Sequence, residues 1–218
     1  MKIGKEISEA TVIASWLKAE SESARFKHLV QKALKKSQLS PALFTQPNLS
    51  DTQDNQNRKR LLRLARHNAI KRFPWRYTIW YELEIESKNE LAKLYTPFGD
   101  TWLAFTYGER TLAKAAEFIA GLPASHDPLK HVLGTQQELA NGRQPEPPIL
   151  VTTGSALSRP LSIVEGNVRL VSYYLYQYTT YPIRAYVGTS PKFATWAHSM
   201  DTLEDIRRAF MKQGKNIE

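Results

Sequence analysis

The residues with the clearest chemical potential form one short turn, Glu165-Gly166-Asn167-Val168-Arg169, between a strand-like stretch and a helix-like one. The first amides of a helix have no partner within it and, together with the helix dipole, they bind anions. Gly166 allows a sharp turn and a close approach by phosphate, and Arg169 can add a charged, bidentate contact. Glu165 could hold a metal ion or act as a catalytic base. The turn predicts a phosphate site made by Gly166, Asn167 and Arg169.

The same five residues also fit a purely structural turn, in which Glu165 pairs with Arg169 or caps the helix. Arg159, in the preceding loop, could cover a bound nucleotide or lie in solvent. The five histidines are scattered, and the spacing of His126 and His131 is poor for a metal ion. The sequence therefore assigns no metal ligands.

The elements around this turn predict a mixed α/β core. Strands are expected at 149–152, 161–164 and 183–187, with a helix over 168–178. Further upstream, we expect strands at 77–86 and 101–107 and helices at 89–95, 109–120 and 127–141, and a last helix is expected at 203–212. Residues 77–218 are thus predicted to form the α/β core with its C-terminal helix.

Residues 1–76 are predicted to form a helical, basic region. Apolar residues recur at spacings of three and four over 6–36, with Ser8 as a candidate N-cap. Two prolines and many small polar residues indicate a long loop over 37–57. A second helix is expected over 58–71, ended by Pro74.

Positive charge is concentrated in this first region. The chain carries a net charge of +9, and 13 basic residues but only Asp51 and Asp54 lie between Arg25 and Arg76. Such a distribution indicates contact with a polyanion, most plausibly nucleic acid, through the 58–72 helix and its Arg60, Arg63 and Arg66. A solvated helical surface is the alternative.

Several classes of protein are excluded by composition. The chain has no cysteine, which excludes disulfides, thiolate metal sites and thiol catalysis. No run approaches the 18 or so apolar residues of a membrane helix, and the N-terminus does not resemble a signal peptide. We therefore expect a cytoplasmic protein with no membrane partner.

The stretch from Pro147 to Gly188 resembles the core of the ParB/sulfiredoxin-like superfamily. In that superfamily two strands lead into a D/E-G-x-x-R motif that opens a helix and is followed by another strand. Glu165-Gly166-Asn167-Val168-Arg169 stands in the place of that motif. The resemblance implies a ParB-like fold with a small mixed sheet, of α+β class, behind a helical basic N-terminal extension.

The resemblance also implies a nucleotide-phosphate site. Gly166, Asn167 and Arg169 would contact phosphate, with Glu165 at the acidic position and a nucleoside triphosphate with Mg²⁺ or Mn²⁺ as the expected cofactor. Sulfiredoxin chemistry is excluded because the chain has no cysteine. Asn167 and Val168 stand where some members have histidines, and an asparagine cannot relay a proton near neutral pH.

Three functional hypotheses follow. The first is a nucleotide- or nucleic-acid-binding protein that carries out metal-assisted phosphoester hydrolysis, as a nucleotidase or nuclease, or that binds without turnover. The second is a non-catalytic DNA- or RNA-binding regulator that uses the basic N-terminal helices. The third is an ADP-ribosyltransferase of the same fold.

Overall fold

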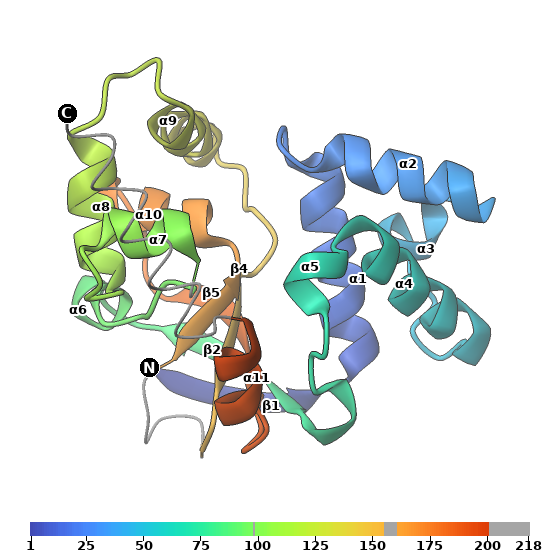
Figure 1. The fold of residues 1–218 in the computed structure, drawn as a ribbon. Helices are drawn as coiled ribbons and strands as arrows, with labels where there is room; N and C mark the ends of the chain where they lie inside the picture. The colour runs from blue at the N-terminus through green and yellow to red at the C-terminus, as the bar shows by residue number, and fades with distance from the viewer. Residues whose placement is uncertain (98, 155–160, 201–218) are drawn as a thin grey trace.

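The computed structural model describes residues 1–97, 99–154 and 161–200 (Figure 1). Five strands form one sheet in the order β1-β2-β5-β3-β4. They are β1 (Lys2–Ile7), β2 (Ile79–Ile85), β3 (Ile149–Thr152), β4 (Ser162–Glu165) and β5 (Ile183–Thr189). β3 runs parallel to β5, and all other neighbours are antiparallel. The predicted α+β class with a small mixed sheet is therefore confirmed.

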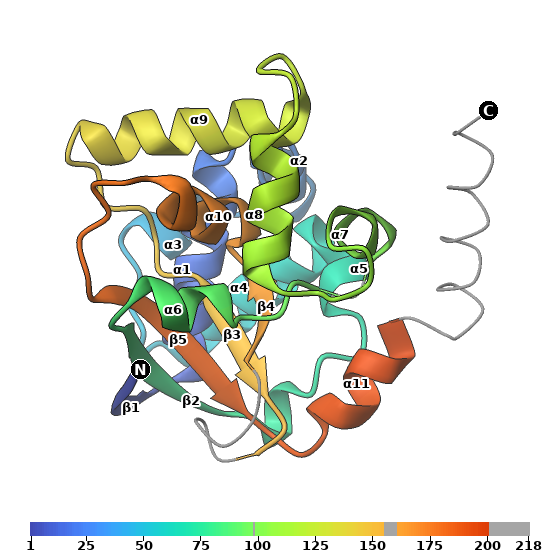
Figure 2. The same ribbon diagram turned by 90° about the vertical axis from the view of Figure 1, so that its left-hand side faces the viewer.

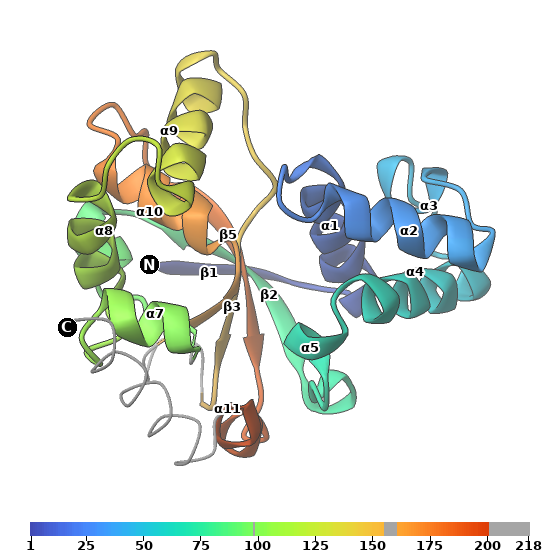
Figure 3. The ribbon, with the colours of Figure 1, turned by 45° about the horizontal axis from the view of Figure 1, so that its top comes forward.

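Helices lie on both sides of this sheet (Figures 1 and 3). One side holds α1 (Glu9–Glu22), α2 (Lys27–Ser37), α3 (Ala42–Thr45), α4 (Thr52–Ala65) and α5 (His67–Ile70), which we call the helical half. The other side holds α6 (Lys88–Ala92), α7 (Asp100–Phe105), α8 (Leu112–Ala120), α9 (Asp127–Ala140) and α10 (Asn167–Leu175). A short 3₁₀ helix, Trp75–Tyr77, precedes β2, and α11 (Phe193–Met200) follows β5 (Figure 2). No helix in the described ranges is long and apolar enough to cross a membrane.

The alternation of side chains along the strands explains the two layers of helices. Trp80 of β2 belongs to the core shared with the helical half, whereas Leu83 of the same strand belongs to the core beneath α8 and α10. On β3, Ile149 and Val151 face the first core and Leu150 faces the second. All five side chains are at most 4% exposed. The sheet is therefore buried on both faces at β2 and β3.

The first 36 residues differ from the single helix predicted over 6–36. Residues 2–7 form β1, which pairs with β2, and the helix breaks between α1 and α2. The prediction of Ser8 as N-cap is confirmed, because its hydroxyl accepts a hydrogen bond from the Thr11 amide at 3.1 Å. Both helices bury a face in the same core, so apolar residues recur at helical spacing in α1 and in α2 alike. Periodicity alone therefore does not show the break between the two helices.

The loop predicted over 37–57 contains α3 and the first turn of α4. Asp51 caps α4 by accepting a hydrogen bond from the Asp54 amide at 2.8 Å. Arg58, which is fully buried, donates to the carbonyls of Leu43 and Asn48, both at 2.8 Å. The hydrogen bonds of buried Arg58 thus hold this polar segment in a defined structure. Apolar periodicity does not predict this structure, because it depends on a charged side chain and not on apolar contacts.

The strand predicted over 101–107 is wrong, because α7 occupies this segment. A short apolar run cannot be assigned to strand or helix by periodicity alone. The predicted helices at 89–95, 109–120 and 127–141 are found as α6, α8 and α9, and the strand at 77–86 as β2. The predicted order of strand, strand, helix and strand around the turn at residues 165–169 is also confirmed, as β3, β4, α10 and β5. The helix predicted at 203–212 lies outside the described residues.

Candidate functional site

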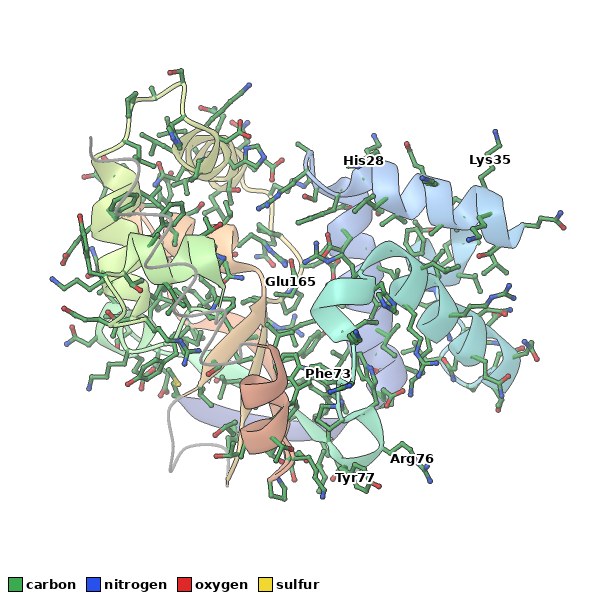
Figure 4. The ribbon with its side chains drawn as sticks, viewed as in Figure 1. His28, Lys35, Phe73, Arg76, Tyr77 and Glu165 are labelled. Atoms are coloured by element: carbon green, nitrogen blue, oxygen red, sulfur yellow. The ribbon has the colours of Figure 1, made fainter. Side chains whose placement is uncertain are left out.

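A cleft of about 1270 Å³ separates the helical half from the sheet and its other helices. The turn between α1 and α2 and the end of α4 line one side, and α9, β4 and the start of α10 line the other. Glu165, at the end of β4, lies beside this cleft (Figure 4). The described lining residues include six basic side chains (Arg25, Arg66, Arg110, Lys130, Arg143, Arg169) and four acidic ones (Glu22, Glu138, Glu146, Glu165). The charged lining is therefore mixed, with a positive excess.

The turn into α10 requires a glycine. Gly166 has φ +91°, in the left-handed region that side chains disfavour. A Cβ atom at this position would lie 2.7 Å from the Cβ of Pro148. Gly166 is also the N-cap of α10 and provides no side-chain cap to the helix. The first-turn amides of α10 thus have no side-chain acceptor from the N-cap residue, and the helix start lines the cleft.

Arg169 is held by two acceptors near this helix start. Its guanidinium forms an ion pair with Glu165 and donates to the backbone carbonyl of Glu146. Both side chains of the pair are largely buried, at 13% and 14% exposure. The pairing expected from a purely structural turn is therefore present. For Arg169 to contact a phosphate with its full charge, its bond to Glu165 must be exchanged for one to the ligand.

A second buried pair lies close to this one. The Glu20 side chain on α1 is 1% exposed, and one of its oxygens lies 3.0 Å from Nε of Arg66 and accepts a hydrogen bond from the Trp16 indole at 3.0 Å. Burial raises the pKa of Glu20 to about 7, and the charge of Glu165 adds to the rise, while Arg66 and Arg169 oppose it. Four ionisable groups, on α1, directly after α4, on β4 and on α10, therefore share one electrostatic environment.

The segment between α9 and β3 forms polar contacts with α1 of the helical half and with α9 on the other side of the cleft. Arg143 contacts Glu22 of α1 at 2.8 Å and Glu138 of α9 at 3.1 Å. Glu146 lies 2.6 Å from Lys18 and accepts a hydrogen bond from Ser15 at 2.7 Å, both on α1. These contacts fix one end of the cleft, and the Glu146 carboxylate raises the pKa of Lys18.

Two polar atoms of cleft residues on β3 and α10 have no hydrogen-bond partner within the described part of the chain. They are Oγ1 of Thr152, a side chain only 3% exposed, and Oδ1 of Asn167. Buried polar atoms in folded proteins are nearly always hydrogen-bonded. Thr152 is three residues along β3 from Ile149, which pairs with Glu165, so the backbone of Thr152 lies about 10 Å along the strand from the level of Glu165.

The predicted site residues are only partly brought together. Glu165, Gly166, Asn167 and Arg169 adjoin the cleft as one turn, and Arg66 lines the opposite side. Arg60 and Arg63 are exposed on α4 and do not line the cleft. Arg159 lies outside the described residues.

The sequence analysis did not single out Glu20, Glu146 and Thr152. Glu20 is one helical turn from Trp16 on the apolar face of α1, and a carboxylate at such a position is the one signal that could have been used. The positions of Glu146 and Thr152 in the cleft depend on contacts between segments that are far apart in the sequence, so no local pattern indicates them. Among the described residues, no group of three or more His, Cys, Asp or Glu side chains could hold a metal ion.

Comparison of the chain with protein-family models, with curated proteins and with solved structures found no match.

Proposed function

We propose that the chain is a nucleotide-binding protein whose core is of the ParB/sulfiredoxin-like type. The ligand lies in the cleft, with its phosphate at the first turn of α10. The observation that carries this proposal is the start of α10 at Gly166, where the helix lines a cleft with a positive excess and has no side-chain cap from its N-cap residue. Amides at such a position favour an anion.

The unpartnered Thr152 hydroxyl favours a nucleotide over inorganic phosphate. It lies about 10 Å along β3 from the residue that pairs with Glu165, beyond the reach of a phosphate held at Asn167. A ligand that reaches both ends of this segment carries a phosphate at one end, held by N–H donors of the α10 start and the Asn167 side-chain NH2, and a hydrogen-bonding group at the other. A nucleotide has this form, and the volume of the cleft accommodates one.

The geometry favours binding over hydrolysis. Glu165 is the candidate base, but its carboxylate is paired with Arg169. While the Arg169 guanidinium occupies the Glu165 carboxylate, that carboxylate is not available to a ligand. We therefore propose binding as the function and treat turnover as an additional property that the same experiment measures.

The test is a thermal-shift screen of the protein against ATP, CTP, GTP and NAD, each with Mg²⁺ or Mn²⁺. A ligand at 100 times its dissociation constant adds about 2.7 kcal/mol, which corresponds to roughly 5–10 °C for a chain of this length. The shift should disappear in Asn167→Asp, which places a negative charge at the phosphate position. It should remain in Arg184→Ala, an exposed arginine on β5 outside the cleft.

Two outcomes would contradict the proposal. One is the absence of a shift with every nucleotide, and the other is an equal shift in wild type and Asn167→Asp. Product analysis of the same mixtures shows whether phosphate or nicotinamide is released, which distinguishes binding alone from hydrolysis and from ADP-ribosyl transfer.

A further inference from the structure

The exposed face of α2 carries an unusual set of charges. Lys27, Lys32, Lys35 and Lys36 are all exposed, and together with the exposed His28 and Gln31 they leave this face without an apolar side chain. No acidic residue occurs between Glu22 and Asp51 in the sequence. Figure 4 shows His28 and Lys35 standing out from α2, away from the rest of the protein.

These lysines form no ion pair within the described residues. Three basic residues in the middle of α4 and at its C-cap behave differently. Arg58 is buried against backbone carbonyls, Lys59 lies 2.6 Å from Glu9, and Arg66 is paired with Glu20. Much of the positive charge that the sequence places in the α4 region is therefore used internally, whereas that of α2 faces solvent.

Part of the charge of α2 opposes the stability of the helix, although Lys35 and Lys36 in its last turn are favoured by the helix dipole. Lys32 and Lys36 are four residues apart and repel each other along the helix. Lys27 occupies the first helical position, where the helix dipole disfavours a cation, and the first turn has no acidic residue. An opposite charge on a partner would relieve both effects.

We propose that this face of α2 is an interface for the phosphate backbone of a nucleic acid. A helix rises about 1.5 Å per residue, so Lys27 to Lys36 extend over about 14 Å. Duplex DNA carries one negative charge per about 1.7 Å of its axis, which provides several phosphates over that length. A membrane-surface helix would need apolar side chains on or beside its charged face, and the exposed positions of α2 have none.

The interface is distinct from the nucleotide cleft, and its lysines are not cleft residues. It therefore adds a polymeric partner to the proposed function. Binding through phosphates alone does not depend on sequence, so DNA and RNA are two sources of the same ligand chemistry.

The test measures fluorescence anisotropy with three labelled probes, a DNA duplex of about 20 base pairs, a DNA single strand and an RNA single strand of equal length. Lys27, Lys32, Lys35 and Lys36 are replaced together by Gln, which preserves helix propensity. The matched control replaces Lys2, Lys5, Lys88 and Lys93 by Gln, four exposed lysines on the β1 edge and around α6. Far-UV circular dichroism and the melting temperature check that both variants are folded.

The α2 variant should lose roughly tenfold or more in affinity for at least one probe, and the slope of log K against log salt should fall by about 3–4 for the duplex. The control variant should stay close to wild type. The nucleotide thermal shift should be the same in all three proteins, so a failure of this inference is distinguishable from a failure of the nucleotide site.

Three results would overturn the inference. They are the absence of binding to every probe, an equal loss in the two variants, and lysine-dependent binding to phosphatidylglycerol vesicles without binding to any nucleic acid.

Discussion

The Glu20 carboxylate lies 3.0 Å from Nε of Arg66, across the helical half from α1 to the end of α4, with only 1% of its side chain exposed. Its second oxygen has no hydrogen-bond partner within the described residues. Burying a carboxylate in this way favours its protonated form, which agrees with a pKa of about 7.

Stability should therefore depend on pH through Glu20. The folded state holds this proton between about pH 4.5 and 7, whereas the unfolded chain has lost it, so stability falls as pH rises through this window and levels off above it. The total contribution is up to about 3 kcal/mol. Urea denaturation from pH 4 to pH 8 measures it.

Glu20→Gln should remove this dependence, because the amide keeps the acceptor for Trp16 but does not titrate. The exposed Glu109→Gln serves as control and should retain the wild-type profile. Parallel profiles for wild type and Glu20→Gln would show that Glu20 does not titrate in this range.

Gly166→Ala should destabilise the protein by about 2–4 kcal/mol, because a Cβ would meet Pro148 and the backbone would be strained as well. Gly142 also has a positive φ, +76°, but nothing lies within 4 Å of its Cβ position. Gly142→Ala should thus show the strain alone, about 1 kcal/mol. Equal losses in the two variants, measured by chemical denaturation, would mean that Pro148 does not constrain the turn.

The Arg169–Glu165 pair should respond as a unit. Arg169→Ala leaves a mostly buried carboxylate without its partner, so stability should fall by about 2 kcal/mol. The double variant with Glu165→Ala should recover much of that loss. Nucleotide binding should be weaker than in the wild-type protein in both variants, because both lack the Arg169 guanidinium.

Glu165→Gln should increase nucleotide affinity, since it removes a negative charge beside the phosphate position and releases Arg169. Isothermal titration calorimetry compares these variants. Lower affinity in Glu165→Gln would instead assign the carboxylate a direct role in holding the ligand.

Arg58→Met should be among the most destabilising single changes, at about 3 kcal/mol or more, since the carbonyls of Leu43 and Asn48 lose a charged donor. Arg60→Ala, an exposed position two residues later, should change stability by no more than about 0.5 kcal/mol. Thermal denaturation of the two variants checks the contrast. Equal melting temperatures would mean that Arg58 does not hold α3 and the start of α4 together.

The candidate residues that sequence analysis and the structure both place together are those within one local pattern. Glu165, Gly166 and Arg169 are neighbours in the chain, and the strand–turn–helix arrangement that positions them has an apolar alternation of its own. Two elements that the sequence analysis did not predict, β1 and α7, lack such a pattern. β1 has charged residues at three of its six positions and forms because β2 pairs with it, and α7 is too short to show a period.

The wider site depends on long-range contacts. Arg66 was predicted to face nucleic acid, but it pairs with Glu20, which is far from it in sequence. The basic side chains of α2 and α4 are equivalent in composition, and only the fold shows which are paired and which are free to meet a partner. Thr152 is a candidate site residue because it lines the cleft, and no local sequence pattern predicts the cleft.

The central claim is that a nucleotide phosphate lies at the first turn of α10. Amide chemical shifts in a ¹⁵N–¹H correlation spectrum, followed during titration with the nucleotide that gives the largest thermal shift, test it most directly. The account predicts that the amides of Asn167, Val168 and Arg169 move with a common dissociation constant, together with that of Thr152. Saturating shifts elsewhere, with these amides unmoved, would contradict it.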